Sequence, residues 1–333
     1  MSKFNKWISM LAVAGILLVG VAGCSSNTDS KTSESNATNT ESSVEAETKI
    51  EVEYTYENND YLVDAQWLEE NINDENLVII DARGQKAYDA KHIKNAIPVA
   101  WQGLSNMAGK PGDLNWGTVG SDKENLSKLI GSLGINEEKK VVIYAAAQNG
   151  WGDDGRIMWT LSKAGLNNVR LLNGGMDYFA QNTSDELLNS EAHEPTAVDF
   201  EIKEINEDGN ITIDELMKNY NDYKVLDTRA QDEYDGAQKY GEARGGHLPG
   251  ATLAKYTDLF REDGRLKDKA ELEKYFSEEL KLNKEDKIVT YCTAGIRSGY
   301  MQIVLEMAGY ENAKNYDGSY YEWAGSDKTE VEK

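Results

Sequence analysis

The residues around one cysteine near the carboxyl-terminal end have the types and spacing of a nucleophilic site. Cys292 follows an apolar run at residues 288–291 and precedes the sequence Thr-Ala-Gly-Ile-Arg-Ser. The run predicts a buried strand, and ligands of open α/β sheets bind at the carboxyl ends of such strands. The backbone N–H groups of the following turn, the amino-terminal end of the next helix and the charge of Arg297 would each stabilise a thiolate. The pattern therefore predicts a cysteine whose pKa is lowered.

A free cysteine is more often a small buried apolar residue than a reactive one. Three features favour reactivity for Cys292: its place at a strand end, the pattern Cys-x-x-Gly-x-Arg, and the presence of one other cysteine only, Cys24. Gly295 permits a tight backbone turn, and Arg297 adds a fixed positive charge. We therefore interpret Cys292 as a catalytic thiol.

The composition argues against several classes of partner. The 333 residues include 58 acidic and 35 basic side chains, which give a formal net charge of −23. Such a surface repels nucleic acid and anionic lipid headgroups. The three histidines lie far apart and have no metal-ligand spacing with the cysteines. We expect no nucleic-acid partner, no metal and no other cofactor.

The amino-terminal segment is typical of an export signal. Two lysines precede an apolar run at residues 7–22, which is too short and too close to the start to favour a spanning helix. Small residues then lead to Cys24, an order that resembles the bacterial lipobox. The resemblance implies a signal peptide at residues 1–23 and a lipid on Cys24, with an uncleaved anchor helix as the alternative. The polar residues 24–55 predict a flexible tether, so we expect an exported protein, lipid-anchored to the extracytoplasmic face of the cell membrane.

Two stretches of the sequence repeat each other. Residues 78–83 and 225–229 each contain an apolar run that ends in Asp-x-Arg, and a loop with a histidine follows. A second pair of apolar runs leads into Ala145, 64 residues after Asp81, and into Cys292, 65 residues after Asp227. The remaining paired segments are two helical stretches, at residues 157–164 and 299–307, and two short strands, at residues 169–172 and 315–316.

The repeat defines the architecture. Short apolar strands that alternate with helices predict an open, mostly parallel sheet flanked by helices. The sequence therefore predicts an α/β protein with two tandem domains of one fold. Polar residues around Pro195 place the boundary near residues 185–200, and we assign residues 56–190 to the first domain and residues 196–328 to the second.

Four motifs occur in order in the second repeat, and the resemblance that they carry covers about residues 60–325. They are the Asp-x-Arg strand end, the loop Gly-His-x-Pro-Gly-Ala, the six-residue loop Cys-x-x-Gly-x-Arg and the closing Tyr-Asp-Gly-Ser-Tyr-x-Glu-Trp. Together they resemble the rhodanese (sulfurtransferase) superfamily in its tandem two-domain form. The resemblance implies that Cys292 accepts a sulfane sulfur, becomes a persulfide and passes that sulfur to a second nucleophile.

The resemblance also implies roles for the residues that follow Cys292. Arg297 would bind an anionic sulfur donor. The persulfide would be cradled by the rest of the loop: Thr293, Ala294, Gly295, Ile296 and Ser298.

Other residues near these motifs are expected to be structural or to line a cleft. Asp227 and Arg229 are expected to form a structural ion pair. His247 belongs to a loop that the family uses structurally, so we do not expect it to act as a base. Arg244 lies near that loop, and we expect it to line the cleft between the domains.

The first repeat departs from the active pattern. Ala145 stands at the position of Cys292, and alanine cannot act as a nucleophile, so we expect the first domain to be catalytically silent and to form one wall of the cleft. Tandem sulfurtransferases of the thiosulfate and mercaptopyruvate types often carry an arginine shortly after the Gly-Gly turn of their first domain. Asp177 occupies that place here, which leaves the identity of the donor open.

Sulfur transfer is the predicted activity. Thiosulfate is the first choice of donor, because a lone arginine and backbone amides suit a compact dianion; mercaptopyruvate is the alternative, and cyanide or a thiol is the acceptor. Phosphatase or arsenate-reductase chemistry is disfavoured because its loops place five residues between cysteine and arginine, whereas four separate Cys292 from Arg297. A binding protein or persulfide carrier at the cell surface, without turnover, is the alternative of another class.

Overall fold

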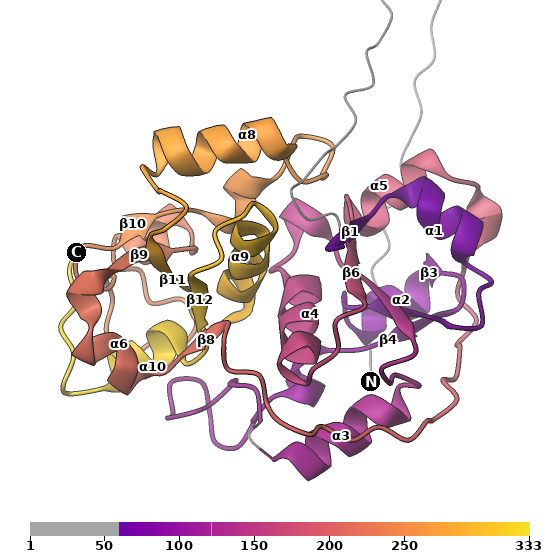
Figure 1. Ribbon diagram of the computed structural model, residues 1–333, viewed down its shortest axis with the longest axis horizontal. Helices are drawn as coiled ribbons and strands as arrows, with labels where there is room; N and C mark the ends of the chain where they lie inside the picture. Colours follow the sequence, from indigo (N-terminus) through magenta and orange to yellow (C-terminus); the bar gives the residue numbers. More distant parts are fainter. Residues whose placement is uncertain (1–59, 121) are drawn as a thin grey trace, which may run out of the picture. The chain divides into compact units, whose positions relative to one another are not determined.

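Two five-stranded parallel sheets of equivalent topology form the framework of the protein (Figure 1). The computed structural model describes residues 60–120 and 122–333, which fall within one contiguous packing unit. The expected signal peptide, the tether and Cys24 lie outside the described residues. Within the described ranges, no helix is both long enough and apolar enough to cross a membrane.

The first sheet has the strand order β1-β6-β5-β2-β4, and every neighbouring pair is parallel. Its strands are β1 (Leu62–Val63), β2 (Leu77–Asp81), β4 (Ala96–Pro98), β5 (Lys140–Tyr144) and β6 (Val169–Leu172). A separate antiparallel pair joins β3 (His92–Ile93) to β7 (Leu188–Asn189). The central strands β2 and β5 are rich in Val and Ile, as expected of strands that are covered on both faces.

The second sheet has the order β8-β12-β11-β9-β10, which corresponds strand for strand to the first. Its strands are β8 (Asn210–Ile211), β9 (Tyr223–Asp227), β10 (Thr252–Leu253), β11 (Lys287–Tyr291) and β12 (Ala313–Tyr316). The central pairs share a register, with Asp81 opposite Tyr144 in one sheet and Asp227 opposite Tyr291 in the other. The prediction of two tandem, mostly parallel α/β domains is therefore confirmed.

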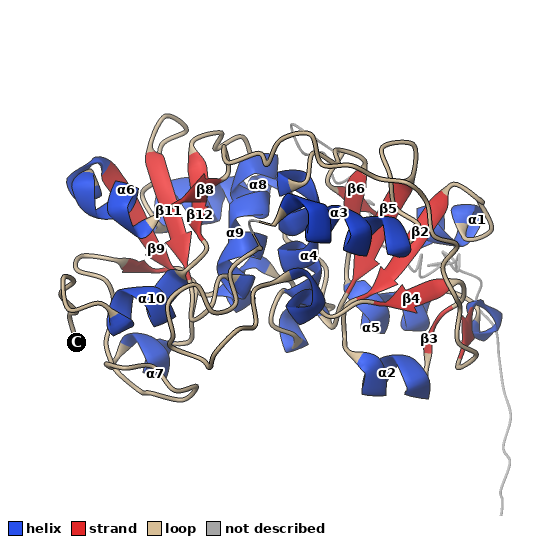
Figure 2. Cartoon of the chain, turned by 90° about the horizontal axis from the view of Figure 1, so that it is seen from below, coloured by secondary structure: helices blue, strands red, loops and turns tan. Residues whose placement is uncertain are grey.

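Helices lie on both faces of each sheet (Figure 2). In the first half they are α1 (Ala65–Asn71), α2 (Gln85–Ala90), α3 (Lys123–Ser132), α4 (Asp153–Lys163) and α5 (Gly175–Asn182). In the second half they are α6 (Ile213–Lys218), α7 (Gln231–Tyr234), α8 (Lys269–Lys274), α9 (Ile296–Met307) and α10 (Ser319–Gly325). The side chains of Asp64, Thr212 and Asp268 accept backbone N–H groups at the starts of α1, α6 and α8, and such caps fix where each helix begins.

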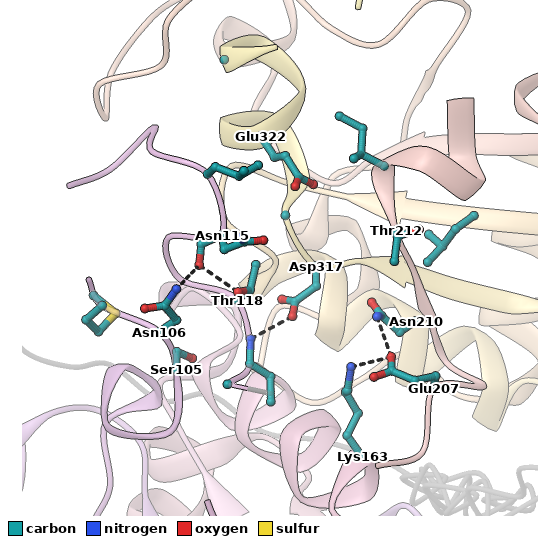
Figure 3. A pocket seen from close by; sticks show the side chains of 18 of the residues that line it. Ser105, Asn106, Asn115, Thr118, Lys163, Glu207, Asn210, Thr212, Asp317 and Glu322 are labelled. Carbon is teal, nitrogen blue, oxygen red and sulfur yellow. Dashed lines mark hydrogen bonds and ion pairs between the residues drawn. The ribbon is translucent and has the colours of Figure 1, made fainter. Parts of the chain in front are cut away.

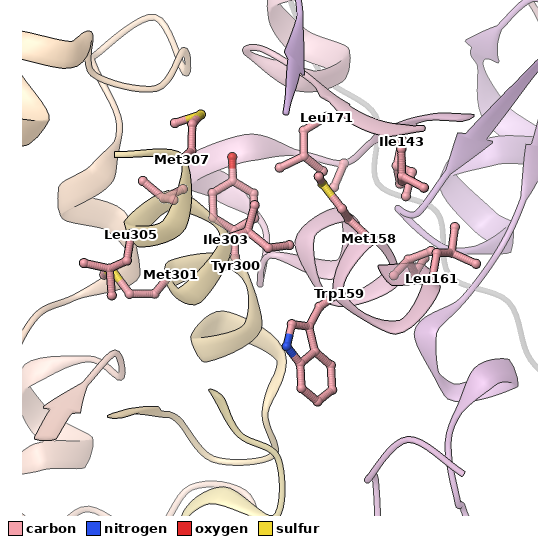
Figure 4. Packing of buried hydrophobic residues seen from close by; sticks show 14 of the residues in the cluster. Ile143, Met158, Trp159, Leu161, Leu171, Tyr300, Met301, Ile303, Leu305 and Met307 are labelled. Atoms are coloured by element: carbon pink, nitrogen blue, oxygen red, sulfur yellow. The ribbon is translucent and has the colours of Figure 1, made fainter. Parts of the chain in front are cut away.

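Helices α4 and α9, which are equivalent in the two halves, pack directly against each other (Figure 4). Met158 and Trp159 of α4 belong to the same cluster of buried side chains as Tyr300 and Ile303 of α9. A side chain at Gly155 would collide with Tyr300, so the close approach of the helices at this point requires glycine. Nearly all of α9 is buried, as expected of a helix enclosed by other elements. The two halves therefore share one hydrophobic core.

The connection between the two sheets, residues 190–209, contains neither helix nor strand. The N–H of Val198 donates to the carbonyl of Gly131 at 2.9 Å, and the N–H of Ile202 donates to Ser127 Oγ at 3.0 Å. Residues that the sequence assigned to the second domain thus pack on α3 of the first half. The assigned domain limits stay a prediction, because packing crosses them.

Candidate active site

Cys292 follows directly after β11, the central strand of the second sheet. Its side chain is only 1% exposed. Its N–H donates to Ser319 Oγ at 3.2 Å, and its carbonyl accepts the N–H of Tyr320 at 3.0 Å. The loop that begins at Cys292 is therefore fastened both to the sheet and to the amino-terminal end of α10.

The surroundings of Cys292 stabilise the thiolate. Burial raises the pKa of the Cys292 thiol, but the charge of Arg297 and the backbone N–H groups of Ser298 and Ala294 outweigh burial, so the pKa is lowered. Helix α9 begins directly after Gly295, whose φ of +81° turns the chain into the helix. The amino-terminal end of α9 adds its own partial positive charge. A lowered pKa increases the fraction of thiolate, which is the nucleophilic form.

Arg297 is buried and is held by Glu233 through two hydrogen bonds. Its Nη1 donates to Oε2 at 2.7 Å, and its Nη2 donates to Oε1 at 2.8 Å. Thr293 Oγ1 donates to Glu233 Oε1 at 2.9 Å and accepts a hydrogen bond from Arg297 Nη2 at 2.9 Å. Burial raises the pKa of Glu233, but bonding to Arg297 and its charge lower it to about 2. The guanidinium of Arg297 is thus held in place near Cys292. A donor anion that binds Arg297 would do so beside the carboxylate of Glu233.

Glu233 is a site residue that reasoning from the sequence missed. It lies in α7, and its Oε2 also accepts the N–H of Ala230 at 3.1 Å. In the first repeat the same place, before Tyr-Asp, is occupied by Ala87. Glu233 replaces alanine only in the repeat that contains the cysteine. This difference between the repeats could have indicated a role for Glu233 specific to the second repeat.

The residues of the loop after Cys292 differ in their contacts. The backbone N–H groups of Ala294 and Ser298 stabilise the sulfur, whereas the hydroxyl of Thr293 donates to Glu233. Ile296 is partly buried and begins α9. The expected cradle is therefore made by backbone N–H groups, and its action on a persulfide stays a prediction.

Aromatic side chains from both halves surround this loop. The ring of Trp151, which precedes α4, lies 4.9 Å from the Arg297 guanidinium and 5.2 Å from the ring of Tyr240. Trp116 contacts Tyr321 edge to face at 5.5 Å. Trp151 and Tyr240 are among the exposed large apolar residues of the described chain. The first half therefore contributes one side of the surroundings of Arg297.

Ala145 follows β5 as Cys292 follows β11, and it offers no nucleophile. Its carbonyl accepts the N–H of Met176 at 3.0 Å. Asp177, the acidic residue expected to change the substrate pocket, is exposed in the first turn of α5. The catalytic silence of the first half stays a prediction.

The first half has an acidic residue at the position that corresponds to Arg297. Gly152 and Gly295 both adopt left-handed conformations and start the equivalent helices α4 and α9. Counted from these glycines, Asp154 stands where Arg297 stands in the second half. Burial raises the pKa of Asp154 to about 7. A carboxyl group at this position could not stabilise a thiolate as Arg297 does.

The Asp-x-Arg motif forms a buried structural pair. Arg229 Nη2 lies 2.6 Å from Asp227 Oδ2, and both side chains are fully buried. The Tyr291 hydroxyl donates to the same carboxylate at 2.5 Å. His247 stacks on Tyr234, with ring centroids 3.7 Å apart, and its Nδ1 contacts the Tyr234 carbonyl at 3.0 Å. These contacts agree with the structural roles expected for Asp227, Arg229 and His247.

Arg244 does not take the place expected of it in the cleft. Its guanidinium donates to the backbone carbonyls of Trp323 and Ala324, in the last turn of α10, and to those of Ser326 and Thr329, which follow it, at 2.7–2.9 Å. Carbonyls at the carboxyl-terminal end of a helix attract a cation, because they carry the negative end of the helix dipole. Arg244 is therefore a helix-capping residue, and these contacts do not support the expectation that it binds substrate in the cleft between the domains.

A cavity of about 1150 Å³ lies apart from the thiol, and Cys292 is not among the residues that line it. Its polar lining includes Lys163, whose Nζ lies 2.8 Å from Glu207 Oε2, and Asp317, whose Oδ2 accepts the N–H of Val119 at 2.9 Å (Figure 3). Among residues 60–120 and 122–333, no cluster of three or more His, Cys, Asp or Glu side chains could hold a metal ion. The candidate active site is therefore the enclosed Cys292 loop and not this cavity.

Comparison with curated proteins finds relatives along most of the chain. Thiosulfate sulfurtransferase from Corynebacterium glutamicum is 26% identical over 291 residues, which cover 83% of this chain and 92% of the relative. A putative thiosulfate sulfurtransferase from Haloferax volcanii is 30% identical, covering 82% of this chain and 96% of the relative. The sulfur carrier protein TtuD from Thermus thermophilus is 28% identical, covering 80% and 95%.

Solved structures share the fold. The anaerobic ergothioneine biosynthesis enzyme from Chlorobium limicola, in complex with trimethyl histidine, matches with a TM-score of 0.72 at 19% identity, over 82% of this chain and 70% of that chain. The wild-type structure of EanB matches with a TM-score of 0.69 at 19% identity, over 82% and 69%. At such identities the similarity concerns the fold alone.

The family itself is found twice in the sequence. The model of the rhodanese-like domain matches residues 64–182 and again residues 212–326, together more than half of the chain. Each match covers four of the five strands of one sheet, and the relatives named as sulfurtransferases extend across both matches. The chain therefore belongs to the rhodanese-like family and is a sulfurtransferase with two tandem domains.

Proposed function

We propose that the protein transfers the outer sulfur of thiosulfate to cyanide or a thiol through a persulfide on Cys292. The observation that carries this proposal is the set of charges and donors around the sulfur, which lowers the pKa of Cys292. A thiolate is the species that attacks sulfane sulfur. The names of the relatives from Corynebacterium and Haloferax support thiosulfate as donor.

The reaction consists of two displacements on sulfur. In the first, the Cys292 thiolate attacks the outer sulfur of thiosulfate; a new S–S bond forms, the S–S bond of thiosulfate breaks, and sulfite leaves with the electron pair. In the second, cyanide or a thiolate attacks the outer sulfur of the persulfide, and thiocyanate or a new persulfide leaves while the Cys292 thiolate is restored. No redox partner is needed, because each step exchanges one nucleophile for another.

Mercaptopyruvate is the alternative donor. In that case the C–S bond of the donor breaks and pyruvate leaves in place of sulfite. Side-by-side kinetics of both donors with cyanide and with a thiol test the assignment. We expect kcat/KM to be higher for thiosulfate; a clear preference for mercaptopyruvate would overturn this choice of donor and leave the persulfide step intact.

A second candidate is a persulfide carrier that exchanges sulfur with proteins and does not turn over small donors. The named sulfur carrier protein TtuD is the observation that favours it. The two candidates differ in the donor that loads Cys292. Loading by a protein persulfide without measurable turnover of thiosulfate or mercaptopyruvate would favour the carrier.

We further propose that the protein is exported and carries a lipid on Cys24, which anchors it to the extracytoplasmic face of the cell membrane. The support is the order of charge, apolar run, small residues and cysteine at the amino terminus. The variant Cys24→Ala should shift the protein from the membrane fraction to the soluble fraction or leave an unprocessed precursor. A correctly cleaved variant that stays with the membrane would refute the anchor.

A further inference from the structure

Arg156 is a fully buried arginine of the first half that reaches the cysteine loop of the second. It lies in the second turn of α4 and is 0% exposed. Its Nη1 donates to Asp317 Oδ1 at 2.5 Å and lies 3.4 Å from the carbonyl oxygen of Gly295. Its Nη2 donates to the carbonyl of Gly117 at 2.8 Å. One guanidinium thus joins the loop that ends at α9 to residues of the other half.

The two partners of Arg156 in the second half both border the Cys292 loop. Gly295 ends the loop and starts α9, and its carbonyl also lies 3.4 Å from Asn315 Nδ2. Asp317 follows β12, and its second oxygen accepts the N–H of Val119. A Cβ atom added at Gly295 would lie 2.7 Å from the carbonyl oxygen of Asp317 and 3.0 Å from Arg156 Nη1. The turn therefore fits tightly between Asp317 and the side chain of Arg156.

The contact that Arg156 makes has no equivalent in the second repeat. Counted from the glycines that start α4 and α9, the counterpart of Arg156 in the second half is Gly299. A Cβ atom at Gly299 would lie 3.8 Å from Arg156 Cα, an ordinary van der Waals distance. Arg156 therefore has no charged counterpart at the equivalent position of α9.

We propose that Arg156 is a positioning residue for sulfur transfer, through which the first domain holds the Cys292 loop in its reactive conformation. The inference rests on the proposed role of Cys292 as nucleophile. A charged donor bound to the Gly295 carbonyl fixes the plane of the peptide that joins Gly295 to Ile296, because C=O and N–H point in opposite directions in a trans peptide. Holding that plane holds the amino-terminal end of α9, and with it the Ser298 N–H that stabilises the sulfur.

The pair with Asp317 decides which variants test this role. Removing one member of a buried ion pair leaves an unpaired charge and can prevent folding. The double variant Arg156→Met with Asp317→Asn removes both charges and leaves the net charge unchanged. Arg156→Lys keeps the charge but gives up the planar fork that reaches several acceptors at once. Lys163→Met is the control, because it removes another ion pair of α4, with Glu207 of the connection between the sheets, without contacting the loop.

The experiment measures the reaction of Cys292 with iodoacetamide in the full-length protein as a function of pH, with the modified peptide identified by mass spectrometry. We expect the midpoint of this profile to rise in the double variant and, to a smaller extent, in Arg156→Lys, and to stay unchanged in Lys163→Met. The rate of persulfide formation should fall roughly 10- to 100-fold in the double variant.

An unchanged alkylation profile in a folded double variant and in Arg156→Lys would overturn the proposal. An equal change in Lys163→Met would also overturn it, because the effect would then belong to the contact between the helices in general. Alkylation needs no sulfur donor, so the outcome is independent of whether thiosulfate is a substrate. Failure of the unaltered protein to form a persulfide would remove the proposed function and leave the positioning role of Arg156 testable.

Discussion

Glu233 binds Arg297 with both carboxylate oxygens, at 2.7 and 2.8 Å, and so divides the charge of that arginine between itself and the neighbouring thiol. Arg297 raises thiolate stability at Cys292 while it keeps the pKa of Glu233 at about 2. The pairing allows a guanidinium to remain buried, because an unpaired buried charge is costly. It also limits how much positive charge a donor anion meets at the site.

Glu233→Gln tests this division of charge. Arg297 would lose its counter-charge, so we expect the pKa of Cys292 to fall further and the KM for thiosulfate to decrease, while the free energy of unfolding falls by about 2–4 kcal/mol. Alkylation kinetics, donor titrations and denaturant unfolding measure the three effects. Asp232→Asn, the same charge change at the neighbouring exposed residue of α7, is the control; an equal response there would show a general effect of surface charge.

The lowered pKa of Glu233 also gives a pH dependence of stability. A carboxyl group with a folded pKa below its unfolded value stabilises the fold above the unfolded pKa, and this contribution is lost as the pH falls toward the folded value. For Glu233 the window extends from an unfolded value of 4.5 down to about 2. The variant Glu233→Gln should therefore lose less stability than the unaltered protein when acidified through this window, as measured by thermal unfolding.

Asp154→Asn should stabilise the protein at mildly alkaline pH. Burial raises the pKa of Asp154 from 3.8 to about 7, so the folded protein binds a proton that the unfolded chain releases, and stability is lost as the pH rises between these values. The amide needs no proton and can still accept the N–H of Gly155. We expect a gain of about 1–4 kcal/mol at about pH 8 and little gain at about pH 4. The exposed Asp177→Asn serves as control, and a gain that does not depend on pH would contradict the explanation.

Cys292→Ser should abolish sulfur transfer, because a hydroxyl group is too weak an acid to supply the anionic nucleophile. The unaltered protein should gain about 32 Da, the mass of one sulfur atom, when it is treated with donor alone, and its kinetics should be ping-pong. Intact-mass spectrometry and initial rates measure these effects. Turnover without any detectable persulfide at Cys292 would rule out the mechanism.

Arg297→Ala should weaken but not abolish the reaction. The backbone N–H groups would still stabilise the sulfur, so we expect kcat/KM for thiosulfate to fall roughly 10- to 100-fold, or about 1.4–2.8 kcal/mol. The pKa of Cys292 should rise, because Arg297 is the largest of the effects that lower it. Because the variant also leaves Glu233 unpaired, Arg297→Ala combined with Glu233→Gln is the second form of the test.

Local features of the fold could be predicted from the sequence. The strand that ends at Cys292, the turn at Gly295 and the buried pair of Asp227 with Arg229 all follow from short motifs whose residues are near each other in the chain. Such contacts depend on backbone geometry over a few residues, and the repeat supports each of them twice. The lowered pKa of Cys292 followed from the same local reasoning.

Contacts between the halves could not be predicted in this way. Trp151 and Arg156 reach the second half because α4 packs on α9 at Gly155. The short sequence motifs do not predict this packing. Arg244 lies close to the Gly-His-x-Pro-Gly-Ala motif in the sequence, but carbonyls at the carboxyl-terminal end of α10 and just after it determine its position. The position of a charged side chain in a loop depends on the polar groups that tertiary packing places near it. The spacing of residues in the sequence does not reveal these groups.

The continuous core formed by α4 and α9 also affects how the protein unfolds. Side chains such as Met158 and Ile303 belong to one cluster, so neither half can open without exposing apolar surface of the other. Two sheets joined in this way should melt in a single cooperative transition, with equal calorimetric and van't Hoff enthalpies. Resistance to proteolysis would then depend on both halves together. Cleavage of the connection at residues 190–209 would leave two fragments that remain associated and that refold only together.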